Sequence, residues 1–460
     1  MSEKKLSRTV LNLSGIGDFG FTLFVNVELY YWAAFLTDCA KFSIGTATFI
    51  LTLTSVIDCI WVPLTGWLIE RSSFKWGKYR SWLVIGPPVM IFTYALEFSK
   101  IGSSEALAAG IVIAAFSIKT LAQDLAYSAS VSLVSDLSND QNERMVLASR
   151  RGQFLSLGNI VFSIIALPLI TWLTALGGNE ILGYSLTAIL FGIINFLCYF
   201  LAFTVTKGHS VSGSGGSEND GADIARQKLP LSQMLAAVFH NPPLLVLIVA
   251  DSFRYLAYFL MSAAAYYYFV VVLQNLAAMT TYLVITRIIG FIGSMFANTA
   301  AKKFGKKPAY LGSLCIMTLS LVLCFFFGRQ VAGFITFHIF VNFFMQITMS
   351  TLTAILADTV IYYEWKSSVD ARGFIMSMLN VPIKVGAVLR STVLGAGLAV
   401  AGYVANTAPT ASQISGISML MNLYPAVFLL LTILIFGLGY RLNEQKVAQM
   451  TKEITARKSV

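Results

Sequence analysis

The sequence contains few charged residues for its length. Only 12% of its 460 residues are Asp, Glu, Lys or Arg, and 57% are hydrophobic, whereas soluble domains contain about 25% charged residues. Most of such a chain is expected to lie in lipid, because too few charges remain to cover a water-exposed surface. The hydrophobic runs are continuous and do not alternate with polar residues. This excludes a transmembrane β-barrel and indicates an all-α membrane protein.

The chain also lacks the patterns of metal sites, disulfide frameworks and common active sites. Its five cysteines are scattered mostly inside apolar runs, its three histidines are dispersed, and no HExxH motif, Ser/His/Asp set or cofactor loop is present. We therefore expect neither enzymatic activity nor a cofactor. The alternative from another functional class is a non-transporting membrane receptor, but such a receptor more often carries a sizeable soluble domain.

Apolar runs long enough to cross a bilayer define twelve expected helices. A spanning helix needs about 20 apolar residues, and Gly, Pro and charged residues separate the runs. A Gly/Ser-rich tract predicts a cytoplasmic linker at 206–232, between an N-terminal six-helix bundle at 1–205 and a C-terminal bundle with a short cytoplasmic tail at 233–460. The predicted spans are 14–36, 43–69, 82–99, 105–134, 153–174, 181–205, 243–273, 278–300, 308–327, 331–361, 374–403 and 418–441.

Basic residues gather in alternate loops. If both termini are cytoplasmic, the opposite side keeps only Lys41, Lys100 and Arg329 in its loops. By the positive-inside rule this predicts a multi-pass protein of the inner (cytoplasmic) membrane, with its N- and C-termini in the cytoplasm. The net charge of +10 is then a matter of topology, and we expect no nucleic-acid partner.

Several ionisable residues fall inside the predicted spans. A charge at mid-bilayer costs about 2.5–3.5 kcal/mol on insertion scales, so it normally faces a protein or water-filled interior. We expect Asp58, Asp124 and Lys384 to meet in one aqueous cavity, and the alternative is a buried structural charge cluster. Asp251 and Arg254, three residues apart, predict a structural ion pair. Other charges predicted to lie deep within the spans are Asp18, Glu28, Lys119, Arg287 and Arg390.

Polar side chains also recur at helical spacing. On the first helix Asp18, Thr22 and Asn26 share one face, and Gln346 and Asn380 belong to similar stripes on the tenth and eleventh helices. These stripes predict either a lining for the substrate cavity or ordinary hydrogen bonds between helices, and both interpretations remain open.

Ordered motifs run along nearly the whole chain. They are GDFG at 17–20, YYWAAFLTD ending at Asp38, Asp58 followed by PLTGW at 63–67, KWGKYRSW at 75–82, NPPLL at 241–245, ADTV at 357–360, and Lys384. Together they resemble the glycoside-pentoside-hexuronide:cation symporters, the melibiose-permease-like branch of the major facilitator superfamily. The resemblance implies twelve helices in two bundles with a site near the midplane, and import of a sugar, glycoside or sugar acid by alternating access.

The resemblance also implies a cation site on the second and fourth helices. Asp58 matches the first acid of the family's carboxylate pair, but the second position holds Val62, and the family's fourth-helix acid and hydroxyl positions hold Tyr127 and Asp124. Sodium needs several oxygen ligands, whereas a proton needs one carboxylate. We therefore rank H+ coupling above Na+ coupling, and both above uncoupled facilitation. Asp58 and Asp124 would be metal ligands only if the cation is sodium, and Lys384 would be their counter-charge.

The expected partners are a small-molecule substrate and the lipid bilayer, and we expect a monomer. Arg151 and the basic loops are predicted to make cytoplasmic gate contacts with acids such as Glu70 and Asp358. The intramembrane bases favour an anionic ligand, such as a uronide, as a variant of the same function. The candidate substrate contacts carry hydrogen-bonding groups suited to hydroxyl-rich ligands; they are Asp18, Thr22, Asn26, Tyr127, Gln346, Asn380 and Lys384.

Overall fold

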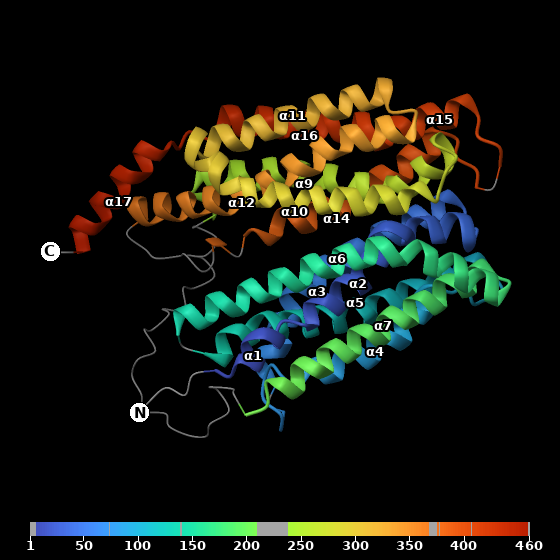
Figure 1. Cartoon of the computed structure of the whole chain (residues 1–460), viewed down its shortest axis with the longest axis horizontal. Coiled ribbons are helices and arrows are strands. Elements are labelled where there is room, and N and C mark those ends of the chain that lie inside the picture. Colours follow the sequence, from blue (N-terminus) through green and yellow to red (C-terminus); the bar gives the residue numbers. More distant parts are fainter. Residues whose placement is uncertain are drawn as a thin grey trace. The chain divides into compact units, whose positions relative to one another are not determined.

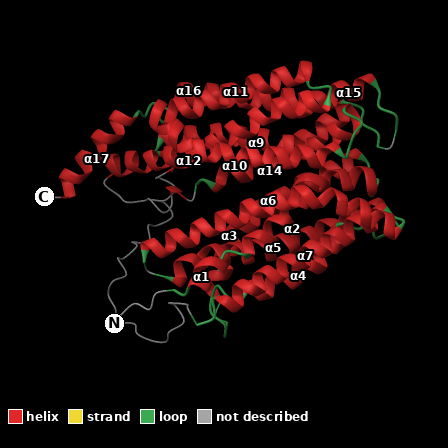
Figure 2. Cartoon of the chain, viewed as in Figure 1, coloured by secondary structure: helices red, strands yellow, loops and turns green. Residues whose placement is uncertain are grey.

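The computed structural model describes residues 6–72, 74–138, 140–208, 238–367, 375–376, 378–405 and 407–458. Within these ranges the chain is helical and contains no strand (Figure 2). In this part of the chain eleven helices are long and apolar enough to cross a membrane, and Trp82–Glu97 is a shorter apolar helix. Each of the twelve predicted spans therefore coincides with a helix. Most of the predicted linker at 206–232 lies outside the described residues.

The first compact unit consists of Met1–Ser217, Met279–Val284 and Gly402–Ala408. Within it α2 packs against α6 and α7, α4 packs against α5 and α7, and α3 packs against α5. Its helices (Figure 1) are α1 (Arg8–Leu13), α2 (Gly17–Ala34) with a π-helical turn at Phe35–Cys39, α3 (Ile44–Arg71), α4 (Trp82–Glu97), α5 (Glu105–Leu137), α6 (Gln141–Gly177) and α7 (Glu180–Val205).

The second compact unit consists of Glu218–Ala278, Ile285–Ala401 and Pro409–Val460. Its helices include α9 (Pro242–Tyr267) with a π-helical turn at Tyr268–Val272, α10 (Ala278–Phe304), α11 (Lys306–Phe327), α12 (Val331–Ser367), α14 (Asn380–Val400), α15 (Ala411–Ser418) with a π-helical turn at Met419–Leu423, α16 (Tyr424–Gly439) and α17 (Glu444–Lys458).

The second unit repeats the helix contacts of the first. Here α9 packs against α14 and α16, and α11 packs against α12 and α16, as α2 packs against α6 and α7 and α4 against α5 and α7. The contact between α3 and α5 has its counterpart where a Cβ on Gly293 of α10 would lie 2.4 Å from the carbonyl oxygen of Phe343 on α12. Each unit is thus a bundle whose helices follow the same packing plan.

Local sequence explains where the helices begin. Ser43 and Ser104 accept hydrogen bonds from backbone N–H groups in the first turns of α3 and α5, which is the usual role of an N-cap serine. Asn241 does the same for α9, and proline follows at the first helical position, where its missing N–H costs nothing.

Two long helical segments lie outside the predicted spans. Helix α6 begins at Gln141 and not at 153, because the charged segment around Arg150 is helical and continues into the apolar run without a break. The predicted tail contains α17, which packs on α12. There the Trp365 indole N–H donates to Glu453, and Arg457 donates to the Trp365 carbonyl.

Candidate substrate and cation site

An ion pair joins the beginning of α2 to α6. Arg151 Nε lies 2.5 Å from Asp18 Oδ2, and its Nη2 lies 2.7 Å from Oδ1. The Asp18 side chain is fully buried and that of Arg151 is 13% exposed. The guanidinium lies 5.8 Å from the ring centroid of Tyr127 on α5, and this ring stacks on Phe21. Three predicted site residues therefore meet within the first unit, and a sugar hydroxyl would have to compete with Arg151 for Asp18.

Thr22 and Asn26, two further predicted substrate contacts, take part in helix packing. Both are buried. Thr22 donates to the carbonyl of Asp18, and Asn26 Nδ2 donates to Thr22 O and, across to α6, to Asn159 Oδ1 at 3.1 Å. A Cβ added to Gly158 would lie 3.0 Å from Thr22 Cβ, so α2 and α6 touch closely here. This stripe therefore includes a hydrogen bond between helices, and its contact with substrate stays a prediction.

The predicted cation ligands lie on neighbouring helices. Asp58 is on α3 and Asp124 is on α5, and both side chains are half-buried. The two helices pack together, and the Trp61 indole N–H of α3 donates to the Ser117 carbonyl of α5 at 3.0 Å. Joint binding of a cation by the two carboxylates stays a prediction.

The remaining predicted contacts belong to the second unit. Asn380 is the exposed first residue of α14, and Lys384 lies one turn further along, half-buried. Gln346 of α12 packs against Gly290 of α10, where an added Cβ would lie 3.2 Å from Gln346 Cγ. Their participation in a site together with Asp58 and Asp124 stays a prediction.

The residues of the predicted gate belong to both units, and their role as a gate stays a prediction. Asp358 of α12 accepts a hydrogen bond from Lys306 Nζ at 2.7 Å, so it does pair with a base of a basic loop. Both residues line a cavity of about 400 Å³ at that end of the second unit. Arg151, however, pairs with Asp18, because the close packing of α2 on α6 places that acid beside it. The side chain of Glu70 lies outside the described residues.

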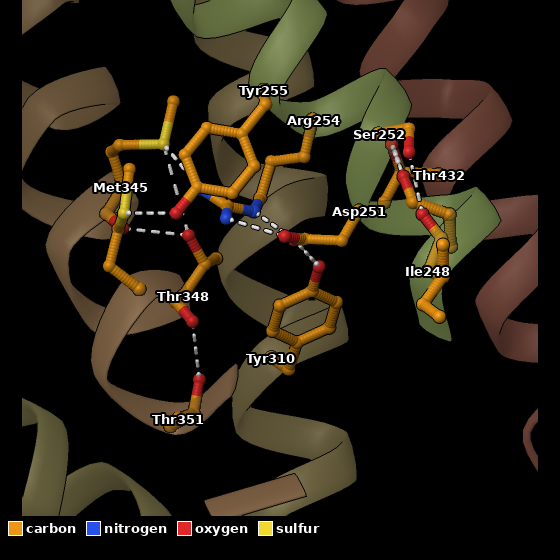
Figure 3. A network of polar contacts seen from close by, with 12 residues as sticks. Ile248, Asp251, Ser252, Arg254, Tyr255, Tyr310, Met345, Thr348, Thr351 and Thr432 are labelled. Carbon is orange, nitrogen blue, oxygen red and sulfur yellow. Dashed lines mark hydrogen bonds and ion pairs between the residues drawn. The ribbon is translucent and has the colours of Figure 1, made fainter. Parts of the chain in front are cut away.

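The predicted structural pair on α9 is confirmed (Figure 3). Arg254 donates to Asp251 through Nε and Nη2, the latter at 3.0 Å, and Tyr310 of α11 donates to Asp251 Oδ1 at 3.0 Å. Arg254 also points Nη1 at the Met345 sulfur, 3.5 Å away on α12. Both charged side chains are almost completely buried. This network joins three helices and is locally neutral.

A second buried charge cluster consists of three residues, none of which was predicted as a site residue. Lys119 of α5 forms ion pairs with Glu28 of α2 and with Glu97, the last residue of α4, at 3.2 Å for the latter. Lys119 and Glu97 are fully buried, and Glu28 is 19% exposed. The signal available in the sequence was Lys119 itself, since a lysine inside a membrane span requires an acidic partner on another helix.

Comparison with known proteins identifies the family. A family model described as MFS/sugar transport protein matches residues 13–444. The chain belongs to this family. It is therefore a multi-pass membrane transporter with the all-α major facilitator superfamily fold, and not an enzyme.

Individual relatives are distant but similar over nearly their full length. The putative sulfoquinovose importer of Escherichia coli (strain K12) is 25% identical over 447 residues, which cover 97% of this chain and 93% of the relative. The putative 2,3-dihydroxypropane-1-sulfonate exporter of the same organism is 27% identical over 452 residues, covering 96% and 95%. Among solved structures, a bacterial homologue of the human lysosomal transporter Spinster has a TM-score of 0.67 at 10% identity, covering 97% of each chain, and this similarity concerns the fold alone.

Proposed function

We propose that this MFS/sugar transport protein imports a sugar, glycoside or sugar acid together with a cation, with a proton favoured over sodium. The observation that carries the proposal is the family match over residues 13–444, supported by relatives named for the transport of sulfoquinovose and of a hydroxylated sulfonate. The proposal includes an inner-membrane location with both termini in the cytoplasm, on the evidence of the basic loops, and a monomeric transporter.

An anionic substrate is the variant that the charges favour. The names of the two relatives denote sulfonates, and the predicted spans of the second half carry Arg287, Lys384 and Arg390. Arg254 is excluded from this role because Asp251 already neutralises it. Lys384 is the base that we expect to bind the acidic group, since it lies one turn from Asn380 on a polar face of α14.

The negative charge of the proposed substrate also gives a reason why the coupling cation is a proton. A monoanion entering a cell against a membrane potential that is negative inside loses about 2.3 kcal/mol per 100 mV. Cotransport of one proton makes the step electrically neutral, so that the pH gradient alone drives accumulation. The acids that we propose for this coupling on α3 and α5 are Asp58 and Asp124, and binding must favour the state that also holds substrate.

Uptake into proteoliposomes tests both parts. Labelled sulfoquinovose, glucuronate and glucose are offered with a pH gradient at fixed sodium, then with a sodium gradient at fixed pH. We expect accumulation of an acidic sugar with the pH gradient. Lys384→Ala should abolish uptake of acidic sugars and spare neutral ones, whereas the exposed Lys452→Ala on α17 should change neither.

The alternatives predict different results in the same assay. Indifference to both gradients, with equilibration of the sugar, would establish an uncoupled facilitator. Absence of any flux, despite sugar binding, would favour a non-transporting receptor. Equal loss of acidic and neutral sugar uptake in Lys384→Ala would refute the anion-specific role of Lys384.

A further inference from the structure

The cluster formed by Glu28, Glu97 and Lys119, here called the acid–lysine triad, contains one acid more than it has bases. Three different helices supply its members, with Glu28 on α2, Glu97 on α4 and Lys119 on α5. The lysine ammonium contacts both carboxylates. If all three groups are ionised, the triad holds a net charge of −1 inside the membrane. A single added proton makes it neutral.

We propose that the acid–lysine triad is a proton-binding site of this transporter, loaded when one carboxylate is protonated and unloaded when both are ionised. In the loaded state the charges are one carboxylate and one ammonium, with one neutral carboxylic acid. Unloading transfers that proton to water and leaves two carboxylates beside Lys119. This inference rests on the proposed proton coupling and assigns residues to it other than Asp58 and Asp124.

The three groups differ in their access to solvent. Lys119 and Glu97 have no exposed side-chain surface, whereas Glu28 is 19% exposed. Glu28 therefore forms the end of the triad that can exchange a proton with water, and Glu97 forms the enclosed end. Glu97 Oε2 lies 3.2 Å from the lysine nitrogen, whereas Oε1 accepts no hydrogen bond within the described residues. An enclosed carboxylate oxygen without a donor is a place where a bound proton can reside.

The surroundings of Lys119 are aromatic. Its ammonium lies 4.3 Å from the ring centroid of Phe116 and 5.4 Å from that of Tyr94, and Trp32 of α2 stacks on Phe116. The Tyr94 hydroxyl donates to the Phe24 carbonyl at 2.8 Å. The rings stabilise the cation but accept no proton, so the two carboxylates are the groups that can change charge.

Helices α7 and α3 pack against the helices of the triad and carry titratable groups of their own. On α7, Tyr184 stacks over Phe98, the residue that follows Glu97. On α3, Asp58 belongs to the helix that contacts α5 on the side of Ser117. Lys119 lies two residues from Ser117, which is about 200° around the helix. Lys119 and the contact with α3 at Ser117 therefore lie on nearly opposite sides of α5.

A purely structural role does not account for the extra acid. Two other buried clusters match one acid with one base, as Asp18 does with Arg151 and Asp251 with Arg254. Those pairs are neutral without a bound ion. Burial of a net charge is costly in lipid, so an excess carboxylate is expected to bind either a proton or a cation. Within the described residues no group of three His, Cys, Asp or Glu side chains could hold a metal ion.

Infrared difference spectroscopy tests the site without any substrate. Purified transporter in liposomes is titrated, and the carbonyl stretch of protonated carboxylic acids is recorded. We expect a band from an enclosed acid that Glu97→Gln removes. Glu105→Gln should retain it, since Glu105 is an exposed residue at the start of the helix that carries Lys119. In Glu97→Gln the remaining acid, Glu28, stays paired with Lys119. This variant therefore imitates the loaded triad and should fold.

Transport provides the second readout, with labelled sulfoquinovose as the probe. A pH difference of one unit drives a one-to-one symporter to about a tenfold gradient. Glu28→Gln and Glu97→Gln should each reduce this ratio to about one while exchange of internal for external sulfoquinovose continues. If both variants keep the infrared band and the tenfold accumulation, the triad is not the proton site, although proton-coupled import would still stand. If the wild-type protein transports none of the sugars, the proposed function fails, and the infrared result alone decides on the triad.

Discussion

Breaking the pair on α9 should destabilise the second unit severely. Asp251→Asn leaves the guanidinium of Arg254 buried without its counter-ion and weakens the acceptor for Tyr310 (Figure 3). Removal of one partner of a buried ion pair typically costs about 3–5 kcal/mol. For a unit of this size, 1 kcal/mol corresponds to roughly 2–4 °C, so the expected drop in apparent Tm is on the order of 10 °C.

The double variant Asp251→Leu/Arg254→Met removes both charges, so it distinguishes the loss of the ion pair from the burial of one unpaired charge. Replacement of both charges by apolar side chains of similar volume is often neutral. The Tyr310 hydroxyl then lacks its acceptor, which costs about 1–3 kcal/mol. We therefore expect the double variant to be more stable than Asp251→Asn. Ser252→Ala is the matched control, since the Ser252 hydroxyl donates to the Ile248 carbonyl of its own helix.

Thermal unfolding with a thiol-reactive dye measures these effects, because Cys324 is buried and becomes reactive when the second unit opens. The expected order of Tm is wild type, close to Ser252→Ala, then the double variant, then Asp251→Asn. If Asp251→Asn unfolds within about 2 °C of the wild type, Arg254 has a second counter-ion and the reasoning from this network fails. A double variant less stable than Asp251→Asn would contradict it equally.

Two further predictions concern packing and the C-terminal helix. A Cβ on Gly386 would lie 2.7 Å from Tyr255 Cβ, so Gly386→Val should lower stability by about 1–3 kcal/mol in the same thermal assay, and an unchanged Tm would show that α14 and α9 are less closely packed. Hydrogen bonds from Trp365 and then Gln449 lower the pKa of Glu453, so its contribution to α17 docking is present above the ordinary Glu pKa and is lost as pH falls through the lowered value. Amide hydrogen exchange of α17, corrected for intrinsic rates, should become faster in the wild type as pH falls through that window. Trp365→Phe should show no such change with pH. Equal pH profiles in the two proteins would contradict the role of Glu453.

Local sequence was enough to predict the positions of the helices, because hydrophobicity and helix signals act over short distances along the chain. A span requires only a run of apolar residues, and serine caps or proline mark its start, so all twelve spans were predicted. The start of α6 was missed because charged residues near Arg150 signal a loop in a membrane sequence, yet they extend a helix equally well outside the lipid.

The pairing of charges was decided by tertiary structure. Asp251 and Arg254 could be paired from sequence because one helical turn brings them together. Asp18 and Arg151 are 133 residues apart, and no periodicity relates them.

For the acid–lysine triad, the sequence marks Lys119 and Glu28 as intramembrane charges but assigns no partner to either, and it gives no sign that Glu97 joins them. The sequence by itself thus determined which segments form the apolar helices, since that depends on each segment's own transfer from water to lipid. Only the packing of α2, α4 and α5 decided which buried acid meets which buried base, because neutralisation inside a bundle depends on neighbours that are distant along the chain.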